Sequence, residues 1–328
     1  MRIGFVILSH EGASKLARLV GALRREYPGC AIAVHHDFSQ ANLDRATIGR
    51  DVLWVEDWRR TGWAKWSVVA GALSAFELLF KQSGIDWFVL LSASDYPIAR
   101  GAEVMKELEA AECDAFLDLR PLNPGAPAKA RLIGEKSVHT GQFDNPLTNA
   151  LKRRFYLSPQ FWLPILRTRP KLRLGKLTWR PRVEGRNPFR GGALHCFYGD
   201  HWFIANRKAV AAILDPNPAN LRLRRHYRSR TQPDESYYQT VLANTPGLVI
   251  CRDNRRFAEW NGGGAHPMAL TRDQLPDMLA SGAFFARKFD AGAAVLDDID
   301  RALAGAKPSS GGTGSRTRRP KRGRSEAS

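Results

Sequence analysis

The stretch Trp87-Phe88-Val89-Leu90-Leu91-Ser92-Ala93-Ser94-Asp95-Tyr96-Pro97 passes directly from large apolar side chains into polar ones. An uninterrupted apolar run over residues 87–91 predicts a strand that is buried on both faces, as in a layered α/β sheet. Ligands of open α/β sheets bind at the carboxyl ends of strands. The sequence therefore places Asp95 where a nucleotide can bind.

Strands and amphipathic helices alternate on the amino-terminal side of this stretch, and the pattern returns near residue 202. Pro and Gly end the first helix near residues 27–29. We expect an α/β fold with a mixed central sheet flanked by helices. The further predicted elements are strands at Ile3–Leu8, Ala31–Val34, Val52–Val55, Trp202–Ala205 and Leu248–Cys251, helices capped by Ser14 and by Ser67, and a helix at Asp234–Leu242.

Two other strand ends carry polar side chains, His10 after the first strand and the run His35-His36-Asp37 at the second. Adjacent residues of a strand point to opposite faces, so the two histidines cannot both bind one metal ion. We expect one of them to be buried and a neighbouring residue to face the ligand.

The chain carries a net charge of +18, and residues 305–328 contribute seven Lys/Arg against one Glu. Gly, Ser, Pro and Arg dominate those residues, which predicts a disordered basic tail after a single domain over residues 1–304. Residues 151–190 lack a clear period and are expected to form loops around an acceptor. The charge favours anionic ligands, so a nucleic-acid or anionic-surface binding protein without catalysis is the alternative function.

Several other classes of protein find no support in the sequence. No apolar run approaches the roughly 20 residues of a membrane helix, and no GxGxxG, GxxxxGKS or GxSxG motif occurs. The four cysteines, at positions 30, 113, 196 and 251, form no close pair. We expect them to be reduced, mostly buried thiols of a cytosolic enzyme.

The segment Pro233-Asp234-Glu235-Ser236-Tyr237-Tyr238-Gln239-Thr240 has two interpretations. Pro and acidic residues suit the first turn of any helix. Alternatively, Glu235 is a general base, held at a rigid helix start, that accepts a proton from an attacking sugar hydroxyl. One such base is sufficient for a reaction that inverts the anomeric carbon.

In Phe284-Phe285-Ala286-Arg287-Lys288-Phe289-Asp290, two cations lie between aromatic residues. Alternation along a strand would direct only one of them into a pocket, where it could offset the charge on a departing nucleotide diphosphate. The only Asp-x-Asp triplet, Asp298-Ile299-Asp300, lies near the tail, where a solvated helix face is expected. Lone Asp95 lacks the oxygen ligands that Mg²⁺ prefers. We therefore expect no metal, with Lys and Arg supplying the positive charge.

Seven segments, in this order along the chain, resemble the core-2/I-branching β-1,6-N-acetylglucosaminyltransferase family (glycosyltransferase family 14), which includes the peptide O-xylosyltransferases. The resemblance covers roughly residues 3–290. Lys65 departs from the small residue common in the third segment, and Asp200 and His201 depart from the fifth. The segments are Ile7-Leu8-Ser9-His10 with Arg18-Leu19, His35-His36-Asp37-Phe38-Ser39, Trp63-Ala64-Lys65-Trp66-Ser67, Leu91-Ser92-Ala93-Ser94-Asp95-Tyr96-Pro97, Tyr198-Gly199-Asp200-His201-Trp202-Phe203, Pro233-Asp234-Glu235 and Phe285-Ala286-Arg287-Lys288-Phe289.

This resemblance implies a Rossmann-like, nucleotide-binding glycosyltransferase fold of the A type and an inverting, metal-independent reaction. The implied substrates are UDP-GlcNAc or UDP-xylose and a hydroxyl of a glycan or polysaccharide, with no cofactor. Animal members of the family are held in the Golgi by a membrane anchor. No such anchor is visible in this sequence, so we expect a bacterial cytoplasmic enzyme whose basic tail contacts the anionic inner face of the membrane.

The resemblance also implies roles for individual residues. Glu235 is the base, and Lys288 binds the UDP diphosphate together with Arg256, for which Arg255 is an equal alternative. The remaining implied residues are His10 and Asp37 at the uridine, Asp95 at the donor, and Asp200, Trp202 and Asp234 at the acceptor.

Overall fold

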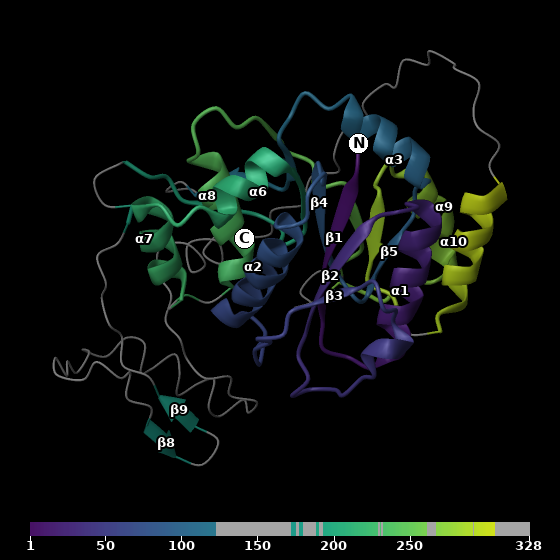
Figure 1. Ribbon diagram of the computed structural model, residues 1–328, viewed down its shortest axis with the longest axis horizontal. Coiled ribbons are helices and arrows are strands. Elements are labelled where there is room, and N and C mark those ends of the chain that lie inside the picture. The colour runs from purple at the N-terminus through teal and green to yellow at the C-terminus, as the bar shows by residue number, and fades with distance from the viewer. Residues whose placement is uncertain are drawn as a thin grey trace, which may run out of the picture.

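A seven-stranded mixed sheet forms the centre of the computed structural model (Figure 1). The structure describes residues 1–122, 172–174, 177–179, 188–189, 193–228, 230, 232–260, 267–290 and 292–305. The strand order is β12-β6-β11-β4-β1-β2-β3, and only β11 runs antiparallel to its neighbours. The strands are β1 (Ile3–Ser9), β2 (Ala31–His36), β3 (Leu53–Trp54), β4 (Trp87–Ser92), β6 (Ala115–Leu117), β11 (Phe203–Asn206) and β12 (Ile250–Cys251).

Helices cover both faces of this sheet (Figure 1). Successive residues of β1 belong to different cores, because Phe5 and Ile7 pack with α1 whereas Val6 packs with α2. The first layer contains α1 (Ala13–Glu26), α3 (Gly101–Glu109), α9 (Leu275–Ala280) and α10 (Ala294–Gly305). The second contains α2 (Trp66–Phe80), α6 (Arg207–Leu214), α7 (Pro218–Tyr227) and α8 (Tyr237–Ala243).

A second sheet, in the order β13-β14-β5, adjoins the first core. It consists of β13 (Arg256–Ala258), β14 (Phe285–Arg287) and β5 (Asp95–Pro97), and its antiparallel register pairs Arg287 with Asp95. The remaining elements are the pair β7 (Arg120–Pro121) and β10 (Phe197–Tyr198), the pair β8 (Leu172–Leu174) and β9 (Leu177–Trp179), and the 3-10 turns η1 (Arg45–Thr47), η2 (Pro233–Glu235) and η3 (Arg272–Gln274).

The mixed α/β sheet flanked by helices confirms the predicted fold class, but both predicted helix caps are wrong. Ser14 lies inside α1, whose N-cap is Gly12. Ser67 lies inside α2, and its hydroxyl accepts a hydrogen bond from the Gly62 amide at 3.1 Å. The single helix predicted at Asp234–Leu242 is also divided, because η2 ends before α8 begins at Tyr237.

The prediction that all four cysteines are thiols is wrong for two of them. Cys113 and Cys251 form a disulfide, with their Cα atoms 5.9 Å apart. Cys113 lies two residues before β6 and Cys251 belongs to the paired strand β12, so the sheet brings together residues 138 positions apart. The spacing of the cysteines in the sequence does not indicate this disulfide.

Residues 306–328 of the predicted basic tail, and most of the predicted acceptor loops at 151–190, lie outside the described residues. The division into domain and tail and the cytoplasmic location therefore stay predictions. Among the described helices, none is both long and apolar enough to cross a membrane.

Candidate active site

Four of the predicted site residues lie at the edge of the central sheet that the carboxyl ends of its parallel strands form. The parallel strands β1, β2 and β4 end there, and antiparallel β11 begins there. His10, Asp37 and Asp95 follow the ends of β1, β2 and β4, and Trp202 precedes β11. Because β11 runs antiparallel to β4, its first residues lie beside the ends of the parallel strands. Trp202, which precedes β11, therefore lies at the same edge as the residues that follow those strands.

Asp95 is buried at this edge, and its carboxylate is held from several sides. It accepts hydrogen bonds from the Ser92 amide (3.1 Å), the Ser92 hydroxyl (2.8 Å) and Arg287 Nε (3.0 Å). Arg256 Nη1 lies 3.6 Å from Asp95 Oδ2, and both of these side chains are at most 1% exposed. Asp95 is therefore suited to hold cations in place rather than to bind a ligand itself.

Arg287 is the cation that Asp95 fixes at the edge. Its guanidinium carbon lies 4.4 Å from the centre of the Trp202 ring, and 15% of its side chain is exposed. Among the described residues, its hydrogen bond to Asp95 uses only Nε, which leaves both Nη groups to bind another anion. An anchored guanidinium with unused donors is an arrangement suited to a phosphate.

Lys288 follows directly and is half-buried. Its carbonyl accepts a hydrogen bond from the Leu270 amide at 2.8 Å, and the Phe289 amide donates to the Ser94 carbonyl at 2.9 Å. These contacts fix the backbone of Lys288 beside the loop that follows β4. The Lys288 ammonium forms no ion pair with the described part of the chain.

Arg255 and Arg256, which the sequence could not separate, point in different directions. The Arg256 side chain is 1% exposed, contacts the Phe285 ring at 5.1 Å, and donates from Nη2 to the Leu90 carbonyl at 3.1 Å. Burial lowers its pKa, although Asp95 opposes this effect. Arg255 instead pairs with Glu107. Arg256 is therefore buried next to Asp95, and its direct contact with a diphosphate stays a prediction.

Glu235 lies in η2, and three hydrogen bonds fix the position of this turn. Its Oε1 accepts from Gln232 Nε2 at 3.0 Å, and its carbonyl accepts from the Gly199 amide at 2.9 Å. The Gln232 amide donates to the Ala64 carbonyl at 3.0 Å. A half-buried carboxylate is thus held beside the loop before α2.

The two acidic side chains near Glu235 in the sequence prediction, Asp200 and Asp234, differ in their hydrogen bonding. Asp200 accepts from Asn254 Nδ2 at 3.0 Å, and burial raises its pKa. Burial also raises the pKa of Asp234 to about 6, and Asp234 Oδ1 has no hydrogen-bond partner among the described residues. Trp202 is buried against Arg287. The contact of these three residues with an acceptor stays a prediction.

A network of buried hydroxyl groups contacts the residue that follows η2, the turn that contains Glu235. Tyr227 Oη lies 2.7 Å from Ser236 Oγ and 3.0 Å from Thr240 Oγ1. Ser236 Oγ donates to the Phe197 carbonyl at 2.6 Å. The network therefore connects α7 to the residue that follows Glu235.

The predicted uridine residues differ in exposure. Burial alone would raise the pKa of Asp37, but hydrogen bonds from Ser39, Gln40 and Thr61 hold it well below the usual range. The Asp37 side chain is fully buried, whereas His10 is exposed. Asp37 can therefore shape this part of the edge, and His10 is the residue positioned to touch a ligand. Both roles stay predictions.

The two histidines of β2 are both buried, so the expectation that only one is buried is wrong. Ser9 Oγ and the Ala41 carbonyl contact the two ring nitrogens of His36. His35 packs against Gly71 of α2 on the other face. Helices and loops cover both faces of β2, which leaves neither ring to a ligand.

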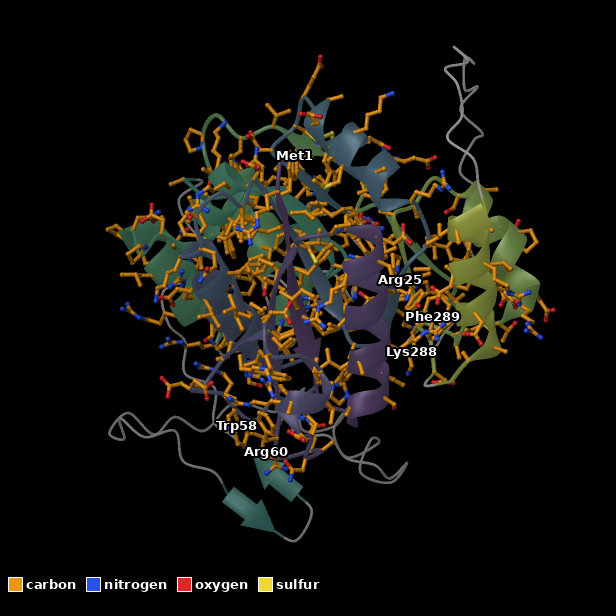
Figure 2. All side chains as sticks on the ribbon, turned by 45° about the vertical axis from the view of Figure 1, so that its right-hand side comes forward. Met1, Arg25, Trp58, Arg60, Lys288 and Phe289 are labelled. Atoms are coloured by element: carbon orange, nitrogen blue, oxygen red, sulfur yellow. A yellow bond between two sulfur atoms is a disulfide. The ribbon has the colours of Figure 1, made fainter. Side chains whose placement is uncertain are left out.

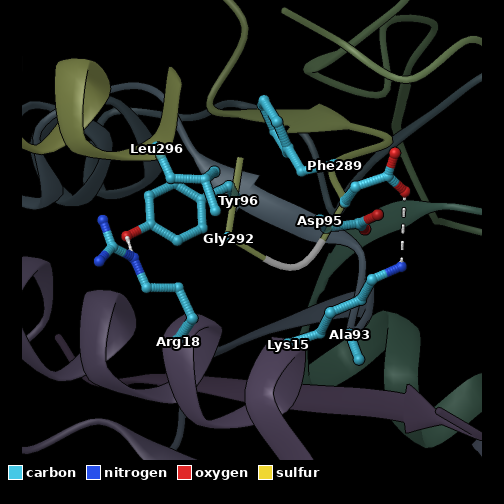
Figure 3. A pocket seen from close by; sticks show the side chains of 9 residues that line it. Lys15, Arg18, Ala93, Asp95, Tyr96, Phe289, Gly292 and Leu296 are labelled. Carbon is cyan, nitrogen blue, oxygen red and sulfur yellow. Dashed lines mark hydrogen bonds and ion pairs between the residues drawn. The ribbon is translucent and has the colours of Figure 1, made fainter. Parts of the chain in front are cut away.

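A small hollow lies between α1 and the segment Asp95–Pro97 (Figure 3). Figure 3 shows Arg18 directed at the Tyr96 hydroxyl, 3.1 Å away. Lys15 Nζ lies 3.8 Å from Asp290 Oδ1. Asp300 of α10 also reaches Tyr96 and Arg18. The Asp298-Ile299-Asp300 helix face is therefore ion-paired rather than merely solvated. In the described residues, no group of three or more His, Cys, Asp or Glu is arranged to hold a metal ion.

A sequence profile described as "Core-2/I-Branching enzyme" matches residues 3–141 and 166–279. The chain belongs to this family. Its membership confirms the predicted family; six of the seven segments lie within the matched residues, and the segment at 285–289 lies beyond them.

Relatives of this Core-2/I-branching chain include two whose sugars differ. It is 27% identical over 248 residues to beta-glucuronosyltransferase GlcAT14B of Arabidopsis thaliana, covering 72% of this chain and 48% of that protein. It is 25% identical over 275 residues to xylosyltransferase 1 of Rattus norvegicus, covering 80% and 28% respectively. The chain thus spans about half or less of the length of these relatives.

Among solved structures, mouse xyloside xylosyltransferase 1 overlaps this family member with a TM-score of 0.35 and 11% identity, covering 89% of this chain and 99% of that one. The bifunctional IspDF of Campylobacter jejuni overlaps with a TM-score of 0.32 and 8% identity, covering 76% and 48%. At these TM-scores neither overlap supports an argument about this chain.

Sequence patterns did not single out Gln232 in this Core-2/I-branching chain, and they could not decide between Arg287 and Lys288 as the cation of the pocket. Arg287 and Lys288 are adjacent, and only the pairing of β14 with β5 shows that Arg287 is anchored by Asp95. Gln232 has φ of 50°, and the position of its side chain against Glu235 depends on this backbone conformation.

Proposed function

We propose that the chain is an inverting, metal-independent glycosyltransferase that moves a sugar from a UDP-sugar to a hydroxyl of a glycan or polysaccharide. The proposal rests on a fixed carboxylate, Glu235, whose carbonyl accepts from Gly199 shortly before β11, and on a guanidinium, Arg287, which is anchored by Asp95 after β4. GlcNAc and xylose are the donors that the sequence motifs suggest, and the glucuronosyltransferase relatives add glucuronic acid.

In the proposed reaction, the acceptor hydroxyl attacks the anomeric carbon while the bond to the UDP oxygen breaks. Glu235 accepts the hydroxyl proton as the new bond forms. Negative charge develops on the departing diphosphate, and the guanidinium of Arg287 and the ammonium of Lys288 stabilise it. Direct attack from the face opposite the leaving group inverts the anomeric configuration.

The positions of the carboxylates support a reaction without a metal ion. Both carboxylate oxygens of Asp95, which follows the central strand β4, already have partners in the protein. They accept hydrogen bonds from Ser92 and Arg287 and form an ion pair with Arg256. Asp298 and Asp300 pair with arginines of other segments. Cationic side chains therefore take the place at which a carboxylate pair would hold a divalent ion.

The substitution Glu235→Gln tests this function against the matched exposed variant Glu103→Gln. We expect Glu235→Gln to slow transfer by about 10²–10⁴-fold, as expected for loss of a general base, while calorimetric UDP binding in EDTA changes little. Glu103→Gln should behave as the unchanged protein. Near-normal turnover of the Glu235→Gln protein would contradict the proposed base, and failure of the unchanged protein to bind UDP would contradict the whole proposal.

A further inference from the structure

Lys65 occupies a position that is unfavourable for the stability of helix α2. It is the N-cap residue of α2, and its side chain makes no capping hydrogen bond. Ser, Thr, Asp and Asn are preferred there, and a cation near a helix N-terminus is repelled by the helix dipole. A residue that local stability does not favour is a reason to look for a functional role.

The Lys65 side chain folds back across its own loop. A Cβ atom built on Gly62 would lie 2.8 Å from Lys65 Cδ and 3.4 Å from Lys65 Nζ. The ammonium therefore lies over Gly62, although the residue as a whole is exposed. It forms no ion pair with any described residue, and the sequence has no acidic residue between Asp57 and Glu77.

The loop under this ammonium connects the two halves of the proposed site. At one end, the Thr61 amide donates to Asp37 Oδ2 at 2.6 Å. At the other end, the Ala64 carbonyl accepts from the Gln232 amide, and Gln232 donates to Glu235. The ammonium thus lies between the end of β2, where a nucleotide is expected, and the base.

Backbone strain occurs at the contact of this loop with the base turn. Ala64 has φ of 57° and Gln232 has φ of 50°, a conformation that non-glycine residues seldom adopt. These two residues are hydrogen-bonded to each other. Strained residues of this kind persist where the surrounding structure fixes a functional geometry.

We propose that Lys65 binds a carboxylate on the donor sugar, so that the donor is a nucleotide-activated hexuronic acid. This inference rests on the proposed function, because the sugar of a bound UDP-sugar must lie between the diphosphate and the base. An ammonium without a carboxylate partner at that place complements an anionic sugar and gains a charge-assisted hydrogen bond from it. A neutral sugar offers no such partner.

UDP-glucuronate and UDP-xylose form a matched pair of probes, because xylose lacks only the carboxylate-bearing carbon of glucuronate. The experiment measures calorimetric Kd values for UDP and both UDP-sugars with the unchanged protein, Lys65→Met and Lys65→Arg. The control is Arg60→Met, which removes an exposed cation at the end of the molecule opposite Met1 (Figure 2).

The unchanged protein should bind UDP-glucuronate more tightly than UDP-xylose. Lys65→Met should weaken UDP-glucuronate binding by about 10- to 100-fold, in the range of a hydrogen bond to a charged group, and change UDP and UDP-xylose by less than about threefold. Lys65→Arg should retain part of the preference, and Arg60→Met should retain all of it.

Two results would overturn the inference while the proposed function stands: equal or tighter binding of UDP-xylose by the unchanged protein, or a glucuronate preference that survives in Lys65→Met. If Lys65 instead bound a carboxylate of the acceptor, Lys65→Met would change the affinity for neither UDP-sugar, which would also overturn the inference. Absence of UDP binding by the unchanged protein would instead overturn the proposed function, and this inference with it.

Discussion

Asp95 Oδ1 accepts a hydrogen bond from Arg287 Nε at 3.0 Å, across 192 positions of sequence. The acid after the central strand thereby fixes the cation that we propose for the diphosphate. The same carboxylate neutralises Arg256, whose side chain is almost completely buried. One residue therefore both positions the cation proposed to bind the diphosphate and neutralises a buried cation of the fold.

Substitution of either partner should separate these two contributions. Asp95→Asn leaves Arg256 buried without a full counter-charge, so we expect it to lower the free energy of unfolding by about 3–5 kcal/mol. Arg287→Met removes a partly exposed cation and should cost less stability, but weaken UDP binding by about tenfold or more. Urea unfolding and calorimetry check both results. An Arg287→Met protein with unchanged UDP affinity would contradict the proposed clamp.

The hydroxyl network behind Glu235 predicts a difference between two buried tyrosines. Tyr227→Phe removes the hydroxyl that contacts Ser236, so we expect kcat to fall by roughly tenfold with the Kd for UDP unchanged. Tyr237 is equally buried, but its hydroxyl accepts from Arg224 instead. Tyr237→Phe should lose similar stability, about 1–3 kcal/mol, and keep its kcat. Equal kcat values for the two variants would show that Tyr227 has only a structural role.

Buried histidines predict acid sensitivity. Burial lowers the pKa of His201 to about 3 and that of His35 to about 4, below the value of roughly 6.5 for an exposed histidine. Below about pH 6.5 the unfolded chain binds protons that the folded protein does not, so the free energy of unfolding falls as the pH falls toward 4. Each histidine contributes up to about 1.4 kcal/mol per pH unit.

Asp234 opposes this trend between about pH 6 and pH 4, because its raised pKa makes the folded protein take up a proton first. Urea unfolding at several pH values should therefore show a net loss of stability toward pH 4. His35→Gln should reduce the slope by about one proton. Identical slopes in His35→Gln and the unchanged protein would contradict the assigned pKa of His35.

The sequence alone indicated the fold class, which the structure confirms, and it predicted the location of the candidate site. Uninterrupted apolar runs such as residues 87–91 specify buried strands, because only a sheet covered on both faces gives every side chain an apolar neighbour. The polar residues that follow these runs mark the ligand edge. Asp95 and His10 could be located in this way, and Glu235 was singled out by the Pro and acidic residues of a helix start, because each of these signals lies within a few residues.

The tertiary structure decided what those residues contact. The disulfide of Cys113 with Cys251, the inward direction of Arg256 and the anchoring of Arg287 by Asp95 all depend on strands that meet from distant parts of the chain. Local patterns cannot predict such contacts, because they record periodicity and not which strand lies beside which. The position of Lys65 over Gly62 likewise follows from backbone conformation, which the identity of neighbouring residues alone does not fix.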